Sequence, residues 1–305
     1  MTWHPGAPGV GSKLRDAQLV ADRLTEWNTK IVGGPLIGLG KEYSLYTGNA
    51  KFVVADSDPA VRSLWRTADE GRLEVEAEYA KRLWSELLKY YSIADDLVGE
   101  AWKHLRFIEK DAIETGRHTA WALCIFAGAI GARRRRNGSG VVNIPYAPKS
   151  QKFGGRRDPN WLPSRIASAE KLRASDQWAK GRLAHEPFDD WRNVFDYLAD
   201  VQVDPCGIAL VVDPPYGHEK GQLYDGKWTN TDRDELVERI SRFTEVGVRC
   251  IAWCGCEEID VWKTIFGMEW SYRKANTHMK SGGVRKDGIE PNRNAGGGYI
   301  GITTG

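Results

Sequence analysis

The sequence predicts an α/β protein built on an open, mostly parallel sheet with a helical and loop insertion. Short apolar runs alternate with segments of helical periodicity, which is typical of consecutive strand–helix units. Residues 208–212 are all apolar and mostly β-branched, as in strands buried on both faces of a parallel sheet. Glycine-rich or acidic turns follow three of the predicted strands, at the edge where open α/β sheets bind ligands.

The first elements are defined by amphipathic spacing and by turn residues. Residues 13–27 carry apolar side chains at helical spacing. Residues 29–32 form a short strand that enters a glycine-rich turn at 33–40, and a second strand covers 51–55. Asp58, which a proline follows, predicts a helix start, because the carboxylate can cap the helix and proline suits its first position.

The rest of the chain is helical at first and then returns to strands. Residues 61–130 have a helical pattern. The apolar run 121–132 is shorter than the roughly 20 residues that span a bilayer, so we expect a buried helix. Residues 131–163 form a long basic loop region. The remaining elements are helices at 164–177, 188–198, 232–243 and 257–265, and strands at 182–185, 208–212, 250–253, 270–274 and 299–303.

Charge and composition limit the functions to consider. The chain of 305 residues has 43 Lys and Arg against 41 Asp and Glu, a net charge of +2 that excludes a uniformly basic coat. Residues 131–182, however, hold thirteen basic and three acidic residues, a net charge of +10 that predicts a local nucleic-acid surface. Residues 1–11 lack the apolar core of a signal peptide, so we expect a cytoplasmic protein. The five cysteines contain no CxxC pair, so we expect no metal site.

The most specific chemical signal is Asp213-Pro214-Pro215-Tyr216, directly after the 208–212 strand. Consecutive prolines fix two φ angles and remove two backbone donors, so this corner is rigid and rich in acceptors. The Asp213 carboxylate and the Pro214 carbonyl can together accept both N–H groups of one amine. Tyr216 adds an aromatic face for a planar base, and positioning and electrostatics then supply the rate. The alternative is an ordinary strand-ending turn.

Asp-Pro-Pro-Tyr after an apolar strand resembles the catalytic motif of DNA methyltransferases that use S-adenosylmethionine to methylate an amino group. The motif order resembles the Dam-type branch, in which an N-terminal Gly-x-Lys motif, a glycine loop, an acidic strand end and a target-recognition insertion precede the catalytic motif. The resemblance implies a Rossmann-like methyltransferase sheet with a mainly helical target-recognition insertion. It places the catalytic domain at 1–60 and 183–305 and the insertion at 61–182.

The same resemblance implies which residues bind the cofactor. Gly34 and Leu36 stand where the family has Glu and Phe in its glycine loop, and Asp58 is expected to cap a helix rather than bind the cofactor. Phe188 is the candidate that packs on the cofactor adenine, with a core phenylalanine as the alternative. The expected cofactor-binding residues are Gly11, Lys13, Pro35, Gly38, Gly40, Asp56 (for the ribose diol), Phe188 and Asp213.

A second motif resembles the family's DNA-contacting hairpin, Arg-x-Asn…Gly-x-Phe-Asn-x-Pro-Tyr-Gly. Arginines, an asparagine and turn residues on a loop can contact phosphates and base edges. Val142 and Ala147 replace the family's Phe and last Gly. The expected DNA-contacting residues are Arg133, Arg134, Arg135, Arg136, Asn137, Asn143, Pro145 and Tyr146.

We therefore expect methylation of the 6-amino group of adenine in double-stranded DNA, after the base is flipped out of the duplex. Tyr224 and Trp228 could hold the flipped base or anchor the loop. The alternatives are another amine (cytosine in DNA, or guanine or adenine in RNA) and a DNA-binding descendant without activity. We expect no membrane partner; a partner restriction endonuclease is left open, and the oligomeric state is not predicted.

Overall fold

The computed structural model describes residues 2–6, 13–91, 97–129, 160–215, 228–274 and 297–304. Its centre is a six-stranded sheet with the order β2-β1-β3-β4-β6-β5. Strands β2, β1, β3 and β4 run parallel, and β6 is antiparallel to both β4 and β5. The predicted mostly parallel α/β sheet is confirmed and is compatible with a Rossmann-like fold. The strands are β1 (Ile31–Gly34), β2 (Lys51–Val54), β3 (Ile208–Val212), β4 (Arg249–Gly255), β5 (Met268–Lys274) and β6 (Gly297–Thr303).

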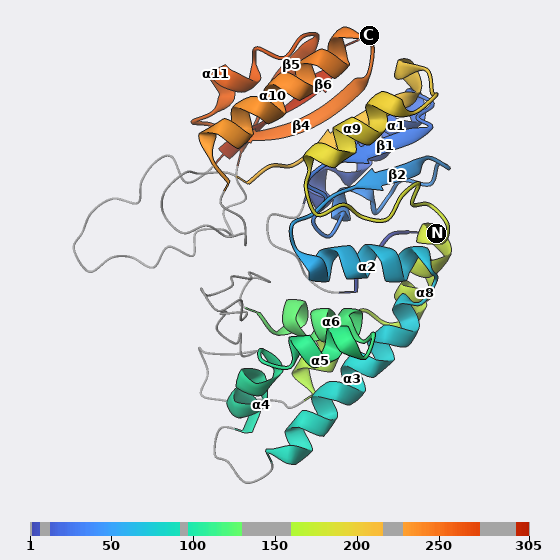
Figure 1. Cartoon of the computed structure of the whole chain (residues 1–305), viewed down its shortest axis with the longest axis vertical. Coiled ribbons are helices and arrows are strands. Elements are labelled where there is room, and N and C mark those ends of the chain that lie inside the picture. Colours follow the sequence, from blue (N-terminus) through green and yellow to red (C-terminus); the bar gives the residue numbers. More distant parts are fainter. Residues whose placement is uncertain are drawn as a thin grey trace, which may run out of the picture.

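Helices cover both faces of this sheet (Figure 1). Successive side chains of a strand point to opposite faces, so Ile208, Leu210 and Val212 join one buried cluster and Ala209 and Val211 join the other. Burial on both faces explains why β3 is apolar throughout. The first cluster includes side chains of α9 (Arg192–Asp200), α10 (Asn230–Glu245) and α11 (Ile259–Trp262), and the second includes those of α1 (Ala17–Glu26).

The other helices lie beyond the β2 edge and extend away from the sheet (Figure 1). The predicted buried helix is confirmed as α6, in which every residue from Thr119 to Gly128 is buried. No helix in the described ranges is long and apolar enough to cross a membrane. The domain boundaries at 60/61 and 182/183 stay a prediction. These helices are α2 (Pro59–Asp69), α3 (Leu73–Tyr90), α4 (Leu97–Leu105), α5 (Glu109–Glu114), α6 (His118–Gly128), α7 (Trp161–Arg165) and α8 (Ala169–Ala179).

The predicted single helix at 164–177 is wrong, because the chain forms two helices with a break between them. Helix α7 ends at Arg165, and α8 begins at Ala169. In the break, the backbone N–H of Ala167 donates to the carbonyl of Gly6 at 2.8 Å. A contact with the N-terminal segment therefore interrupts a helix that local periodicity alone would continue.

The predicted helix at 188–198 starts later, at α9, because Phe188 is extended and pairs with the end of β2. Its N–H donates to the carbonyl of Val54 at 2.9 Å, and its carbonyl accepts from the N–H of Asp56 at 3.1 Å. The predicted strand at 182–185 is reduced to one parallel bridge between Leu183 and Phe52. These contacts place Phe188 beside Asp56, which follows β2.

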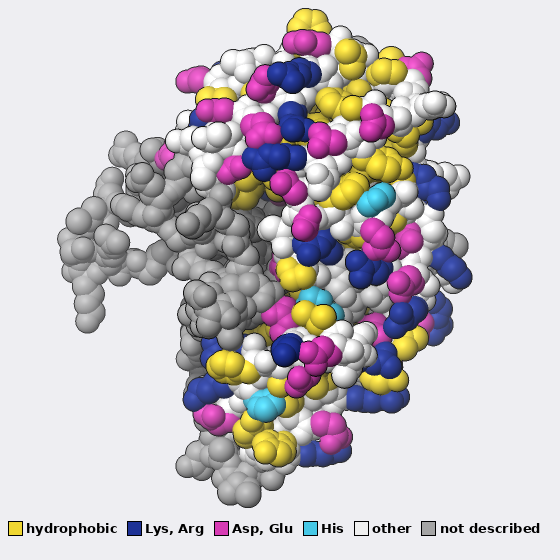
Figure 2. Space-filling view, in the orientation of Figure 1, with side chains coloured by type: hydrophobic (Ala, Val, Ile, Leu, Met, Phe, Trp, Pro, Cys, Tyr) yellow, Lys and Arg dark blue, Asp and Glu magenta, His cyan; other side chains and the backbone are white. Residues whose placement is uncertain are grey.

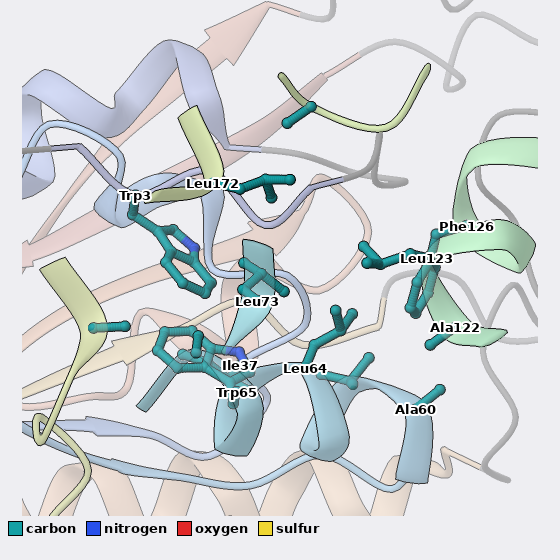
Figure 3. Packing of buried hydrophobic residues seen from close by; sticks show 14 of the residues in the cluster. Trp3, Ile37, Ala60, Leu64, Trp65, Leu73, Ala122, Leu123, Phe126 and Leu172 are labelled. Atoms are coloured by element: carbon teal, nitrogen blue, oxygen red, sulfur yellow. The ribbon is translucent and has the colours of Figure 1, made fainter. Parts of the chain in front are cut away.

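Two tryptophans from distant parts of the chain fix the glycine loop that follows β1 (Figure 3). The indole Nε1 of Trp65 donates to the carbonyl of Gly38 at 3.0 Å, and that of Trp3 donates to the carbonyl of Leu39 at 2.9 Å. The two rings stack with their centroids 4.8 Å apart. Since both indoles are buried, the loop is held by the core rather than by its own sequence alone.

Candidate active site at the carboxyl edge of the sheet

The strand order reverses between β1 and β3, because β2 pairs on one side of β1 and β3 on the other. Ligands of open α/β sheets bind at such a switch point, beyond the carboxyl ends of the strands. Three predicted motifs meet this edge: the glycine loop after β1, Asp56 after β2 and Asp213 after β3.

Lys13 and Asp213 form a close ion pair at this edge. The Lys13 Nζ lies 2.7 Å from Oδ1 of Asp213, and the two side chains are only 11% and 22% exposed. Lys13 directly precedes the short 3-10 helix η1 (Leu14–Asp16) and lies 5.8 Å from the centroid of the Trp253 ring. The structure thus brings Lys13 and Asp213, which are far apart in sequence, into direct contact.

A buried acid that follows the glycine loop, Glu42, was not found by the sequence reasoning. It lies in the short 3-10 helix η2 (Lys41–Tyr43) and is 8% exposed. The pKa of Glu42 is raised to about 8, mainly by burial and to a smaller extent by the negative charge of Asp213, while a backbone hydrogen bond and the positive charge of Lys13 oppose the rise. The only signal in the sequence was that Glu42 follows the glycine loop, which is too common an arrangement to indicate a role.

Asp56 holds the glycine loop as well as ending the second strand. Its Oδ2 accepts from the backbone N–H of Gly38 at 3.0 Å, and its Oδ1 accepts from that of Asp58 at 2.8 Å. Asp58 in turn accepts from the N–H of Ala60 and caps α2, which confirms its predicted cap role. The Asp56 carboxylate is therefore oriented toward the loop; its contact with a ribose stays a prediction.

The two glycines of the loop differ in what surrounds them. Gly38 and Gly40 both have positive φ angles, +51° and +60°, which favour glycine. A Cβ on Gly40 would lie 2.4 Å from Cζ2 of Trp65, whereas a Cβ on Gly38 would meet no atom of the described residues within 4 Å. Gly40 is therefore required by packing, and Gly38 leaves the space that a closely approaching ligand would need.

A cavity of about 530 Å³ opens at the same edge of the sheet, against Pro35 and Pro215; its lining does not include Gly38, Lys13 or Asp213. Its apolar wall includes Trp191 and Trp228, whose ring centroids lie 6.1 Å apart. The indole Nε1 of Trp228 is buried and has no hydrogen-bond partner in the described part of the chain. The residues that line the cavity are Pro35, Leu36, Ser57, Asp189, Asp190, Trp191, Arg192, Pro215, Trp228 and Asp232.

The cavity lining carries more negative than positive charge. Arg192 is its only cation among the lining residues, and its guanidinium bonds Asp190, Asp232 and Glu235 at 2.7 to 3.4 Å. These bonds raise the pKa of Arg192 and lower those of Asp232 and Glu235. Because the guanidinium is already paired with three carboxylates, this wall is poorly suited to a phosphate and better suited to a neutral or cationic ligand.

Phe188 is half-buried beside Asp56, and His185 stacks on it. The two ring centroids lie 4.2 Å apart with an interplanar angle of 13°. Sequence reasoning assigned no partner to His185, since the two residues meet only because the chain turns against β2. Among the described residues, no cluster of His, Cys, Asp or Glu could hold a metal ion.

The structure brings Lys13, Asp213, Pro214 and Pro215 to this edge, with Pro214 buried and Pro215 in the cavity wall. The remaining site residues lie outside the described ranges. They are Gly11, Tyr216, Tyr224, Arg133, Arg134, Arg135, Arg136, Asn137, Asn143, Pro145 and Tyr146.

Eight of the thirteen basic residues in 131–182 also lie outside the described ranges. Of the rest, Arg173 pairs with Glu74 at 2.7 Å and Arg182 donates to the carbonyl of Gly48 at 2.6 Å. Figure 2 shows basic and acidic side chains interspersed on the visible face of the described part. Some of the basic residues that give this segment its net charge of +10 therefore form contacts within the protein.

Comparison with known proteins does not assign this chain to a family: no protein-family model matches it, and no curated protein matches it significantly. The geometry of the site is therefore what supports a function.

Proposed function

We propose that this protein is a DNA methyltransferase that transfers a methyl group from S-adenosylmethionine to the 6-amino group of adenine. The observation that carries the proposal is the convergence of three motifs at the switch point of the sheet. Lys13 contacts Asp213 directly, and the glycine loop is bonded to the acidic end of the neighbouring strand. The motif order that resembles the Dam-type branch thus corresponds to one cluster in space.

The residues at this edge fit the cofactor. A cavity of about 530 Å³ is within the range of about 300–1,000 Å³ typical of small-molecule sites. Its tryptophan and proline walls suit a flat nucleoside, and the space over Gly38 admits close approach. The acidic lining favours a cationic nucleoside over a nucleotide, because a phosphate would meet carboxylates and an already paired arginine.

The cofactor, when bound, supplies an electrophilic methyl group on a sulfonium. Asp213 and the Pro214 carbonyl are the acceptors that would hold the two N–H groups of the target amine and aim its lone pair. Lys13 holds Oδ1 of Asp213 at 2.7 Å and so orients this carboxylate. A duplex hides this amine within the base stack, so the proposal includes base flipping. Tyr216 would stack on the flipped base.

Contact with double-stranded DNA is proposed for the 61–182 part, with the arginines at 133–136 and the 137–146 segment as the reading elements. Arginine and asparagine can contact both phosphates and base edges. A salt-dependent DNA affinity that falls when Arg133–Arg136 are replaced by alanine would support this assignment.

The test is transfer of a tritiated methyl group to DNA, followed by identification of the modified nucleoside. We expect N6-methyladenine, and we expect Asp213→Ala to lower the rate by about two orders of magnitude or more. The control is Asp234→Ala, which removes a 58% exposed carboxylate on α10. Another methylated base would redirect the proposal to a different amine. Retained DNA binding without cofactor binding would indicate the non-catalytic descendant.

A further inference from the structure

Two tryptophans from different helices meet in the wall of the cavity and form a corner there. Trp191 directly precedes α9, and Trp228 precedes Thr229, the residue that caps α10. Their ring centroids lie 6.1 Å apart, with 58° between the ring planes. A base sandwiched between two parallel rings would need about 7 Å, because each contact takes about 3.5 Å. The two rings therefore offer a planar ligand one face and one edge rather than a slot.

The side chain of Arg192 joins the two helix starts that carry these rings. Its Cζ lies 4.5 Å from the centroid of the Trp191 ring. Its guanidinium donates to Oδ1 of Asp232, in the first turn of α10, at 2.9 Å. Oδ2 of Asp232 accepts from the backbone N–H of Thr229 at 2.9 Å, and Thr229 follows Trp228. A continuous chain of contacts thus runs from one ring of the corner to the backbone beside the other.

The guanidinium of Arg192 has few donors left for a ligand. Its partners are Asp190 at 3.4 Å, Asp232 at 2.9 Å and Glu235 at 2.7 and 2.9 Å. These bonds use four of its five N–H groups. Glu235 is also bonded by Arg239 at 3.1 Å, and neither of these two residues lines the cavity. Because the planar fork of arginine fixes several partners at set angles, this network is suited to holding the cavity wall in place.

We propose that Arg192 is a positioning residue for the nucleoside: by joining α9 to α10 it sets the corner of Trp191 and Trp228, and this corner holds the adenine of the cofactor. This inference rests on the proposed function, which brings a purine nucleoside to the cavity. Phe188, to which the resemblance assigns the adenine, is not among the residues that line the cavity, and His185 stacks on it at 4.2 Å. The two fused rings of a purine can lie on one indole and reach the other, which a single-ring base is too small to do.

The experiment is titration calorimetry of the full chain with adenosine, which carries the base without the charged methionine end. Arg192→Lys keeps the positive charge and gives up the planar fork, so a loss of affinity for this neutral probe reports the geometry of the corner. Stacking on one aromatic side chain is worth about five- to hundredfold in affinity. We therefore expect Trp228→Leu to weaken adenosine binding about tenfold or more, and Arg192→Lys about fivefold.

Further variants show whether Arg192 acts through the rings. Glu235→Gln removes a partner of Arg192 that does not line the cavity, so it should weaken adenosine binding without the loss of a ligand contact. In a Trp228→Leu background, Arg192→Lys should have little further effect, because the corner is already lost. The matched control is Arg242→Lys, on α10: this arginine pairs with Glu238, is 70% exposed and does not line the cavity, so the variant should bind as wild type.

A measurement on the wild-type protein keeps the inference testable if a melting curve shows that a variant does not fold. Adenosine should bind about tenfold more tightly than cytidine, because only the purine contacts both rings. Equal affinity for the two nucleosides would overturn the corner. Unchanged adenosine binding in Arg192→Lys, or effects of Arg192→Lys and Trp228→Leu that simply add, would overturn the positioning role.

The outcomes also separate this inference from the proposed function. Methyl transfer to DNA by a protein whose adenosine binding depends on neither Arg192 nor Trp228 would overturn the inference and leave the methyltransferase proposal standing. Adenosine binding that depends on both residues, in a protein that transfers no methyl group, would overturn the proposed reaction and leave the nucleoside corner standing. Failure of the wild-type protein to bind both adenosine and S-adenosylmethionine would overturn both.

Discussion

The buried acid Glu42 should make the ligand-free protein less stable as pH rises, and Glu42→Gln should remove this dependence. Glutamine matches the protonated carboxyl in shape and stays neutral at every pH. The carboxyl has an ordinary pKa of 4.5, which applies to the unfolded chain, and a pKa of about 8 in the folded protein. Between these values the folded state holds a proton that the unfolded state has lost. Stability therefore falls as pH rises through this window.

The size of the effect follows from the two pKa values. One unit of pKa difference corresponds to about 1.4 kcal/mol. Integrated from pH 5 to pH 8, the wild-type protein should lose about 3 to 4 kcal/mol of unfolding free energy relative to Glu42→Gln. For a chain of 305 residues, an unfolding entropy of about 2.1 cal/mol/K per residue converts this to a relative shift in melting temperature of about 5 °C.

The assay is thermal and urea-induced unfolding of both proteins at several pH values from 5 to 9, without cofactor. The difference in melting temperature between the two should widen steadily from pH 5 to about pH 8 and level off above pH 8, where the folded protein also loses the proton. Glu114→Gln, which removes a 61% exposed carboxyl, should track the wild-type protein throughout. A constant difference between wild type and Glu42→Gln across this range would refute the reasoning, since it would mean that Glu42 is ionised in the folded protein.

Three further predictions concern the glycine loop, the ion pair and the cavity. Gly40→Ala should lower the melting temperature strongly, because its Cβ would lie 2.4 Å from Trp65. Gly38→Ala, with open space around it, should cost only about 1 kcal/mol of stability for its positive φ yet weaken cofactor binding measured by calorimetry; normal binding would argue against ligand approach over Gly38. Lys13→Met should lower the unfolding free energy by about 2 kcal/mol, because Asp213 loses its partner in a half-buried pair. It should also weaken cofactor binding, and unchanged values of both would show that the pair is not needed. In competition experiments adenosine should displace the cofactor at much lower concentration than ATP does, because the cavity lining is acidic; equal competition would contradict the charge argument.

The parallel strands of the sheet could be predicted from the sequence because each contains a short apolar run that ends at a recognisable turn. The cap at Asp58 could be predicted for a similar reason, since capping depends on residues that are close in sequence. The break between α7 and α8 could not, because it depends on a hydrogen bond from Ala167 to Gly6. Local periodicity contains no information about such a partner.

In the candidate site, too, the features set by local sequence could be predicted, and those set by contacts between distant residues could not. Lys13 and Asp213 were predicted as members of one site from their motifs, but their direct contact is set by how the N-terminal segment folds onto the sheet. Gly38 and Gly40 look alike in sequence, and only the position of Trp65 distinguishes the packed glycine from the open one. Glu42 was missed because its unusual protonation comes from burial, which no spacing reveals.

The glycine loop has no acid at Gly34, where the family that the sequence resembles has Glu, and the packing supplies a physical reason. A Cβ on Gly34 would lie 2.6 Å from Cδ1 of Ile37, whose buried side chain occupies that space. A side chain at position 34 would require the end of the Ile37 side chain to move, so glycine suits the packing of the loop at this point. A buried acid does follow the loop two residues after Gly40, at Glu42 in η2. Because burial raises the pKa of Glu42 to about 8, the unfolding series with Glu42→Gln measures whether this acid is charged in the folded protein, as an exposed acid would be at neutral pH.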